Sequence, residues 1–394
     1  MATETPKFLV TCQSATVEII EALFRGRILV KSICDLLKRK PSIENSGDNY
    51  GVEAASNSGL IVVNQGMGYD NTKALCLDVV SDELNKYKAE AYEEAKRRDS
   101  DLFEKVVAEL SKRNMTDEQA LSEFREPSMQ YDYAEAQKAY IKAGTPELAS
   151  VLSNILAERI GESSRTLLQI ALGESIQIAP KLIETQMATL ALAFILKHTV
   201  RLNVNDHSSL VEYIQNTVLP IYKKGVSQKQ SEFQHLNFTG CSQYSAVSQK
   251  LPSLFLNTYS GLFMKGIEKD KLPKDADGKS FVDLYPNLFL KCLNNSDTLQ
   301  INAMSEDVLT TLIERLDMSQ EHQQIFKKLF KENRMSEEAV QKLVVKLVPE
   351  MQDVFDYWAN SGIALLTLTS VGIVIGAQYA KIITGQDYNL NIWI

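Results

Sequence analysis

The sequence predicts a mainly α-helical protein: a multi-helix bundle with a short β-prone segment near the N-terminus and a small strand–helix–strand element at the C-terminus. Three observations predict this class. Glycine and proline, which interrupt helices, number only 18 and 10 in 394 residues. Apolar residues recur at helical spacing along most of the chain. The length exceeds that of one ordinary core, so we expect several domains.

Composition and charge narrow the classes of function. Apolar residues make up 44% and charged residues 23%, as in a water-soluble globular chain. The net charge of −8 does not indicate a nucleic-acid binder, although a local basic patch stays open. No secretory signal pattern opens the chain, and no CxxC pair occurs, so we expect thiols in a reducing cytoplasm. The cysteines are Cys12, Cys34, Cys76, Cys241 and Cys292.

Residues 1–71 are predicted to form an N-terminal helix followed by a Gly/Asn-rich, β-prone segment. Turn-forming residues at 45–51 and 57–59 flank the apolar run 60–63. Amide side chains and glycines beside such a run suit strand pairing, including pairing between identical chains. We therefore predict an interaction surface made of Asn49, Val62, Val63, Asn64, Gln65 and Gly66. The alternative is an ordinary loop or small hairpin.

Residues 72–144 are predicted to be a charged helical region. From Asp82 to Glu126 the chain carries 13 acidic and 9 basic residues, which suits a solvated helix. A narrow apolar stripe at helical spacing predicts a long helix that is exposed or lies at the edge of a bundle. The stripe consists of Val80, Leu84, Tyr87, Ala91 and Ala95.

Residues 145–300 are predicted to be an apolar helical core domain. Thr145 and Pro146 are a helix start, and Gly161 is its stop. Two more apolar helices are expected at 167–178 and 187–196. We expect Asp206 to cap a further helix that runs to Leu219 and stops at Pro220, because proline interrupts a helix.

Residues 301–394 are predicted to be a C-terminal helical domain whose helices are capped by Ser305, Ser319 and Ser336. The tail is interpreted as a buried strand at 363–368, a helix capped by Thr369 or Ser370, and a final strand at 390–394. The uncharged stretch 357–380 is long enough to span a bilayer. Its polar residues favour burial in the protein instead, so we expect no membrane contact.

Motifs for chemistry are few. The chain lacks a phosphate-binding loop, a dinucleotide fingerprint, HExxH and GxSxG, so we expect no metal and no cofactor. His235 and Cys241 are residue types that can form a nucleophile pair, but such pairs usually come from separate elements, so we do not expect one here. Asp275, Asp277 and Gly278 have only part of a calcium-loop pattern. Ordinary interhelical ion pairs are the favoured interpretation of the charged residues Glu162, Arg165 and Glu174.

Several stretches resemble an uncharacterised bacterial family. They lie at 45–49, 66–69, 174–182 and 235–241, and the most specific is the tail. The tail motif, LT-x-x-G followed by L-[SN]-I-W-I, occurs here at 368–372 and 390–394. The resemblance covers much of the chain from residue 45 and implies no established activity. Similar Gly/Asn-rich openings occur on proteins of bacterial defence islands, which associates the chain with anti-phage defence.

The function predicted from these features is that of a non-enzymatic bacterial interaction protein, acting through self-assembly or a protein partner in phage defence as a sensor or effector. Main-chain hydrogen bonds of an added strand would supply affinity. One alternative is a nuclease or nucleotide-hydrolysing enzyme whose site is assembled only in the fold. The other is a membrane-acting toxic effector that uses residues 357–380.

Overall fold

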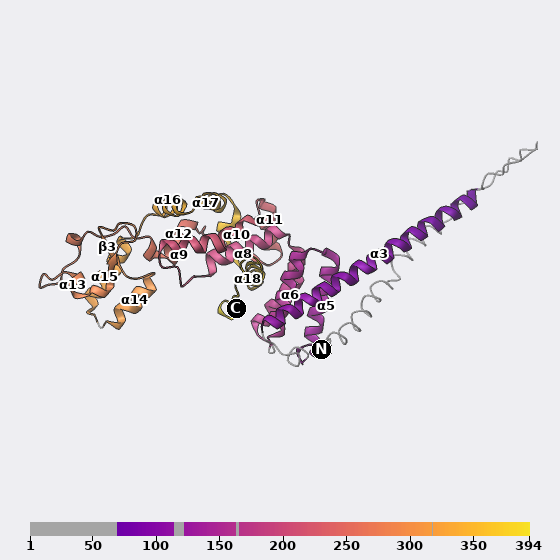
Figure 1. Ribbon diagram of the computed structural model, residues 1–394, viewed down its shortest axis with the longest axis horizontal. Coiled ribbons are helices and arrows are strands. Elements are labelled where there is room, and N and C mark those ends of the chain that lie inside the picture. Colours follow the sequence, from indigo (N-terminus) through magenta and orange to yellow (C-terminus); the bar gives the residue numbers. More distant parts are fainter. Residues whose placement is uncertain (1–68, 114–121, 163–164, 317) are drawn as a thin grey trace, which may run out of the picture. The chain divides into compact units, whose positions relative to one another are not determined.

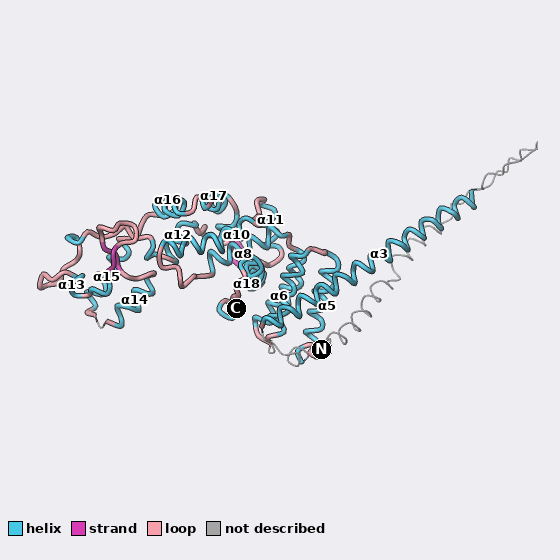
Figure 2. The backbone as a smooth tube through the Cα atoms, in the orientation of Figure 1, coloured by secondary structure: helices cyan, strands magenta, loops and turns pink. Residues whose placement is uncertain are grey.

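The computed structural model describes residues 69–113, 122–162, 165–316 and 318–394 (Figure 1). Helices dominate these ranges, and the strands form only two-stranded sheets (Figure 2). The predicted mainly α-helical class is therefore confirmed. The predicted interaction residues Asn49 and 62–66 lie outside the described ranges, as does the predicted N-terminal helix. By backbone contacts the chain divides into two compact units, Met1–Asp101 and Leu102–Ile394.

In the first unit, the described residues belong to helix α3, which runs from Tyr69 to Lys112 and so continues into the second unit. Its 44 residues carry many charges that neighbour one another on the helix surface. Glu94 accepts hydrogen bonds from Arg97 at 2.7 Å and from Arg98 at 2.8 Å. These two bonds lower the pKa of Glu94 to about 2, and the bond from Arg97 has the larger effect. Such pairs stabilise the exposed face of the helix.

The second unit has a bundle in its centre. The bundle contains α5 (Pro127–Ala143), α6 (Pro146–Ile160), α7 (Leu167–Ile178), α8 (Glu184–His198) and α18 (Ser370–Thr384). Residues 186–196 of α8 are all buried, as expected of a helix that is apolar on every side. The predicted boundaries at Gly161 and at 167–178 are confirmed. Helix α18 packs against α6, α7 and α8 and joins the C-terminal tail to this core.

A π-helical turn changes the predicted end of the next helix. Asp206 caps α9 (His207–Tyr213) by accepting a hydrogen bond from Ser209 N–H at 2.7 Å, as predicted. The predicted stop at Pro220 is wrong, because the chain continues through a π-helix, η2 (Ile214–Val218), into α10 (Leu219–Lys223). The wider turn, in which Leu219 N–H bonds to the Ile214 carbonyl, accommodates the proline at the start of α10.

Smaller elements extend this bundle. They are α11 (Gln230–Phe238), β1 (Ser242–Tyr244), α12 (Leu251–Thr258), α16 (Glu337–Leu347) and α17 (Met351–Asn360). Strand β1 pairs antiparallel with β4 (Leu366–Leu368), so segments far apart in sequence lie side by side. Helix α12 packs against both α16 and α17.

A further apolar cluster lies between residues 264 and 330 of the second unit. It is built by α13 (Phe281–Leu284), β2 (Phe289–Lys291), β3 (Leu299–Ile301), α14 (Glu306–Arg315) and α15 (Gln320–Glu332). Phe326 is fully buried and contacts the rings of Phe281, Tyr285 and Phe289. Strands β2 and β3 form an antiparallel pair. The predicted caps Ser305 and Ser319 hold the starts of α14 and α15.

The C-terminal tail follows the prediction in part. Thr369 caps α18 and Gly385 ends it in the left-handed conformation, as expected. The strand predicted at 363–368 is shorter: η6 (Gly362–Leu365) is a 3₁₀ turn, and only β4 is extended. The strand predicted at 390–394 is wrong, since η7 (Leu390–Ile392) is a 3₁₀ turn. Its Leu390 is buried, and Trp393 Nε1 donates to the His198 carbonyl at 2.8 Å, which favours a turn over an extended chain.

Candidate interaction surface

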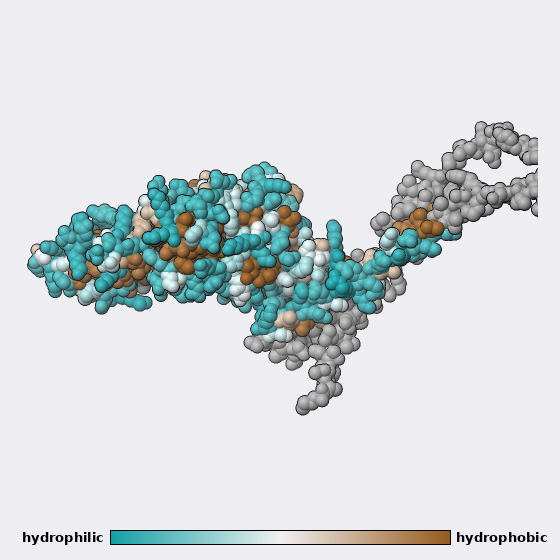
Figure 3. Space-filling view, turned by 45° about the horizontal axis from the view of Figure 1, so that its top comes forward, coloured by the Kyte–Doolittle hydropathy of each residue, from teal (hydrophilic) through white to brown (hydrophobic). Residues whose placement is uncertain are grey.

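The most distinctive exposed feature of the first unit is an apolar stripe along α3. Leu77, Val80, Leu84 and Tyr87 are 40%, 54%, 54% and 58% exposed. Figure 3 shows apolar surface, in brown, on the N-terminal part of α3. Three and then four residues separate successive members, which places all four side chains on one face of the helix. We call Leu77, Val80, Leu84, Tyr87 and Ala91 the α3 stripe.

The α3 stripe is unusual because the same helix buries its apolar residues further along. Within the second unit, Leu102 and Val106 of α3 have no exposed surface and Leu110 only 5%. Large apolar side chains aligned on a helix are normally covered by another element. The stripe at 77–91 is therefore a surface suited to binding another helix.

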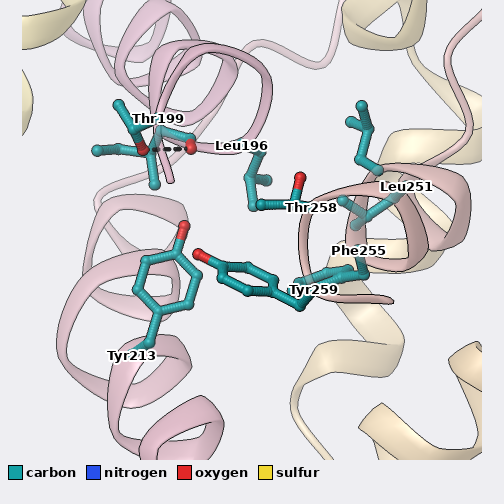
Figure 4. Close-up of a pocket in the computed structure, with 9 residues that line it drawn as sticks. Leu196, Thr199, Tyr213, Leu251, Phe255, Thr258 and Tyr259 are labelled. Carbon is teal, nitrogen blue, oxygen red and sulfur yellow. Dashed lines mark hydrogen bonds between the residues drawn. The ribbon is translucent and has the colours of Figure 1, made fainter. Parts of the chain in front are cut away.

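A second feature is a small pocket in the second unit, between α8, α9 and α12 (Figure 4). Tyr213 and Tyr259 point their hydroxyl groups toward one another there. The Tyr259 oxygen accepts a hydrogen bond from Arg201 N–H at 2.9 Å, and burial raises the pKa of both tyrosines. The cavity volume is about 10 Å³, the lower limit for a single water molecule. This pocket is a packing feature and is too small for a substrate.

An open groove lies between α5 and the turn η1 (Ala179–Lys181) that follows α7. Three of its lining residues are lysines: Lys138, Lys142 and Lys181. Lys138 is already paired with Glu135, at 3.3 Å between Nζ and Oε1. The groove is a local positive patch on an acidic chain, and it can attract anionic groups by charge. The prediction that nucleic acid is a possible partner remains a prediction.

His235 and Cys241, which the sequence did not favour as a nucleophile pair, have other partners. His235 Nδ1 lies 3.1 Å from Nε2 of Gln186. The Sγ atom of Cys241 lies 3.5 Å from the Thr239 hydroxyl oxygen instead. Burial raises the pKa of the Cys241 thiol to about 11, so the reactive thiolate is scarce near neutral pH. Cys241 and Cys292 are buried free thiols, as predicted for ordinary core cysteines.

One buried charge was not foreseen from the sequence. Lys197 of α8 donates hydrogen bonds from Nζ to the carbonyls of Ile363, Ala364 and Leu366, at 2.8, 3.2 and 2.7 Å. The ammonium also lies 5.2 Å from the Trp358 ring centroid. These contacts join α8 to the turn before β4. Burial lowers the pKa of Lys197 to about 8.

The sequence favoured interhelical ion pairs for Glu162, Arg165 and Glu174. The structure has such a pair between two other residues. Arg159 of α6 is 3% exposed and donates from Nε to Oδ2 of Asp132 on α5 at 3.0 Å. Desolvation raises the pKa of Asp132, against the lowering effect of Arg159. Glu162 accepts instead from the Thr166 hydroxyl at 3.4 Å. The pair holds α5 against α6 and is structural.

Two properties of the described ranges bear on metal sites and on membrane contact. Among those residues, no group of three or more His, Cys, Asp or Glu side chains is placed to hold a metal ion. In the same part of the chain, no helix combines the length and the apolar character needed to cross a bilayer. The uncharged stretch near 370–380 instead forms α18, whose residues 371–380 are all buried in the protein.

A comparison with known families shows to which family the chain belongs. Residues 66–394 match the model of an uncharacterised protein family. The chain belongs to this family. The matched range includes all of α3, so the stripe lies inside the family region, whereas Asn49 and Val62 lie before it. No curated protein and no solved structure gives a significant match.

Proposed function

We propose that the protein is a non-enzymatic bacterial interaction protein that acts by assembling with copies of itself or with a protein partner. The observation that supports this proposal is the α3 stripe, in which four large apolar side chains are at least 40% exposed on one helical face. Full burial of an exposed side chain of this kind contributes about 1.5–3 kcal/mol, so burial of one that is about half exposed contributes roughly half of that. Four together can offset part of the entropic cost of association, which is about 4–15 kcal/mol.

The predicted β-prone surface fits the same proposal. Asn49 and residues 62–66 precede α3 directly in the chain. Strand pairing through them would add main-chain hydrogen bonds to the apolar contact of the helix. Assembly would then use two adjacent contacts, one helical and one extended.

Antiviral defence is the cellular role proposed for this assembly, and the cytoplasm its compartment. The resemblance of the Gly/Asn-rich opening to proteins of defence islands supports it. The test is the plaquing efficiency of phages on bacteria that carry the gene in its native context. We expect a reduction, and unchanged plaquing across a broad phage panel would contradict this role.

Light scattering of the purified full chain tests the assembly itself. The variant lacks residues 41–70, and the control lacks residues 1–40. We expect the wild type and the control to exceed the monomer mass of 44.2 kDa, allowing for the deletion. The variant should show a lower average mass at the same concentration, because it keeps only the contact through the α3 stripe. Unchanged mass after deletion of 41–70 would contradict the role of that segment. Magnesium-dependent phosphodiester cleavage by the monomer would favour the enzymatic alternative.

A further inference from the structure

The α3 stripe has the heptad spacing of a coiled-coil seam. Leu77, Leu84 and Ala91 follow one another every seven residues, and Val80 and Tyr87 lie three residues after the first two. Side chains repeated every 3.5 residues keep facing a partner helix that supercoils around the first. The seam covers 15 residues, about 22 Å of helix. We infer that a second copy of this chain binds the α3 stripe as a parallel, in-register coiled coil; this rests on the proposed assembly function.

The charges beside the seam select a second copy in parallel orientation. Glu83 and Lys88 flank the seam on its two sides, at the positions called g and e of the heptad, and both are exposed. In a parallel pair, a g residue faces the e residue five positions later on the partner helix. Glu83 of each copy therefore faces Lys88 of the other, which gives two attractive pairs by symmetry.

The antiparallel alternative is disfavoured by the same residues. In that orientation g residues face g residues, and both g positions within the seam, Glu83 and Glu90, are acidic. Like charges would then oppose each other across the interface. Glu83 and Lys88 also lie five residues apart, so they are not neighbours on their own helix. Their complementarity is available only between helices.

The position of the seam in the chain supports the same orientation. Residues 41–68 lead directly into α3. A parallel α3 pair brings the two copies of that segment to the same end of the coiled coil. Pairing of identical strands, in register, requires this arrangement. An antiparallel pair would separate the two segments by the length of the seam.

The first test compares two substitutions of the same chemistry in the full chain. Leu84→Asp places a charge in the seam, where Leu84 is 54% exposed. Val79→Asp places the same charge outside the seam, where Val79 is 55% exposed. We expect analytical ultracentrifugation to show a concentration-dependent dimer for the wild type and for Val79→Asp, and a monomer for Leu84→Asp. Circular dichroism confirms that all three proteins keep their helix content.

A charge-exchange series tests orientation. Glu83→Lys alone and Lys88→Glu alone each replace two attractive pairs with two repulsive ones, so each dimer should weaken about 10-fold. Mixing the two single variants should restore wild-type affinity as a heterodimer. The double variant Glu83→Lys/Lys88→Glu should restore it as a homodimer, because the attractive pairs reappear with their charges exchanged.

Each outcome decides between specific statements. A dimer that Leu84→Asp leaves intact overturns the α3 seam, while the proposed self-assembly stands through another surface. If Leu84→Asp abolishes the dimer, but the double exchange does not recover the affinity that the single charge variants lose, the parallel orientation is overturned. A wild-type chain that stays monomeric at every concentration overturns binding of a second copy and leaves only assembly with a different protein.

Discussion

Lys197 shows how a single residue can join segments that are distant in sequence. Its three carbonyl acceptors lie 166 to 169 residues further along the chain. A lysine near a helix end is usually a solvated charge, so no local pattern indicated this role. The helix caps at Thr369, Ser305 and Ser336 were predictable, because a cap bonds to a backbone group three residues away. Residue roles set by neighbours in sequence are predictable, and those set by the fold are not.

Lys197→Met should destabilise the fold. The substitution removes a donor that three carbonyls share. Those of Ile363 and Ala364 still accept from backbone N–H groups, of Leu366 and Gln249, so the loss falls mainly on the Leu366 carbonyl and costs about 1–3 kcal/mol. Urea denaturation at pH 7 measures this loss, and Lys346→Met, at an exposed position of α16, is the control. A midpoint equal to that of the control would contradict the role of the ammonium.

The difference in stability between the wild type and Lys197→Met should change with pH in a definite direction. Burial lowers the pKa of folded Lys197 from 10.5 to about 8. Between these values the unfolded chain binds more protons than the folded chain, so rising pH stabilises the fold. The wild type should therefore gain stability relative to Lys197→Met from pH 8 to about 10.5. Parallel stability curves over that window would show that the charge is not perturbed by burial.

Cys241 should be resistant to alkylation in the folded protein. Its side chain has no exposed surface, and a pKa of about 11 leaves roughly one thiolate in a thousand at pH 8. Peptide mapping after iodoacetamide treatment separates this thiol from the other cysteines. We expect labelling in urea and almost none in buffer. Equal labelling rates in the two conditions would indicate an accessible, reactive thiol.

At the scale of elements, α18 depends on small residues for its close packing. A Cβ atom added at Gly376 would lie 2.7 Å from the Leu190 carbonyl of α8, and one added at Gly372 would meet the Cys241 carbonyl. The sequence predicted that α18 is buried and where it starts and ends. It did not predict which helix the glycines face, because partner choice depends on the whole packing. The π-helical turn at 214–218 was also missed, since its sequence resembles an ordinary helix.

Gly376→Ala should destabilise the protein by about 1–3 kcal/mol, because backbone atoms of α8 cannot move away from the new methyl group without disturbing the core. Gly173→Ala in α7 is the matched control. There the nearest atom to an added Cβ is an Asp132 carboxylate oxygen at 3.4 Å, an ordinary contact. The control should be neutral or more stable by about 0.5–1 kcal/mol, since alanine favours helix. Thermal unfolding measures both, and equal effects would refute close packing at Gly376.

At the scale of the whole molecule, helical periodicity and composition predicted the fold class. The residues of the α3 stripe from Val80 to Ala91 were visible in the sequence as well. The sequence predicted a helix that is exposed or lies at the edge of a bundle, and it could not decide between the two, because an apolar stripe looks the same whether the fold covers it or leaves it open. The predicted surface at Asn49 and 62–66 lies outside the described residues and stays a prediction. The apolar pattern of the α3 stripe is thus set by the local sequence, whereas its exposure to a partner is a property of the fold.

Disulfide cross-linking can report how two whole chains are arranged. In a parallel, in-register coiled coil, the two copies of Tyr87 face each other across the seam, so Tyr87→Cys should form a disulfide-linked dimer on oxidation. Val79→Cys lies on the outer side of the helix and should add nothing to the background from the native cysteines. Non-reducing electrophoresis measures the species of doubled mass. Since only residues at the same level can meet, equal cross-linking of the two variants would exclude the in-register arrangement. Cross-linking of Tyr87→Cys alone would agree with the parallel pair or with an antiparallel pair centred on Tyr87, and Leu77→Cys separates the two, because two copies of a second seam residue meet only in the parallel pair.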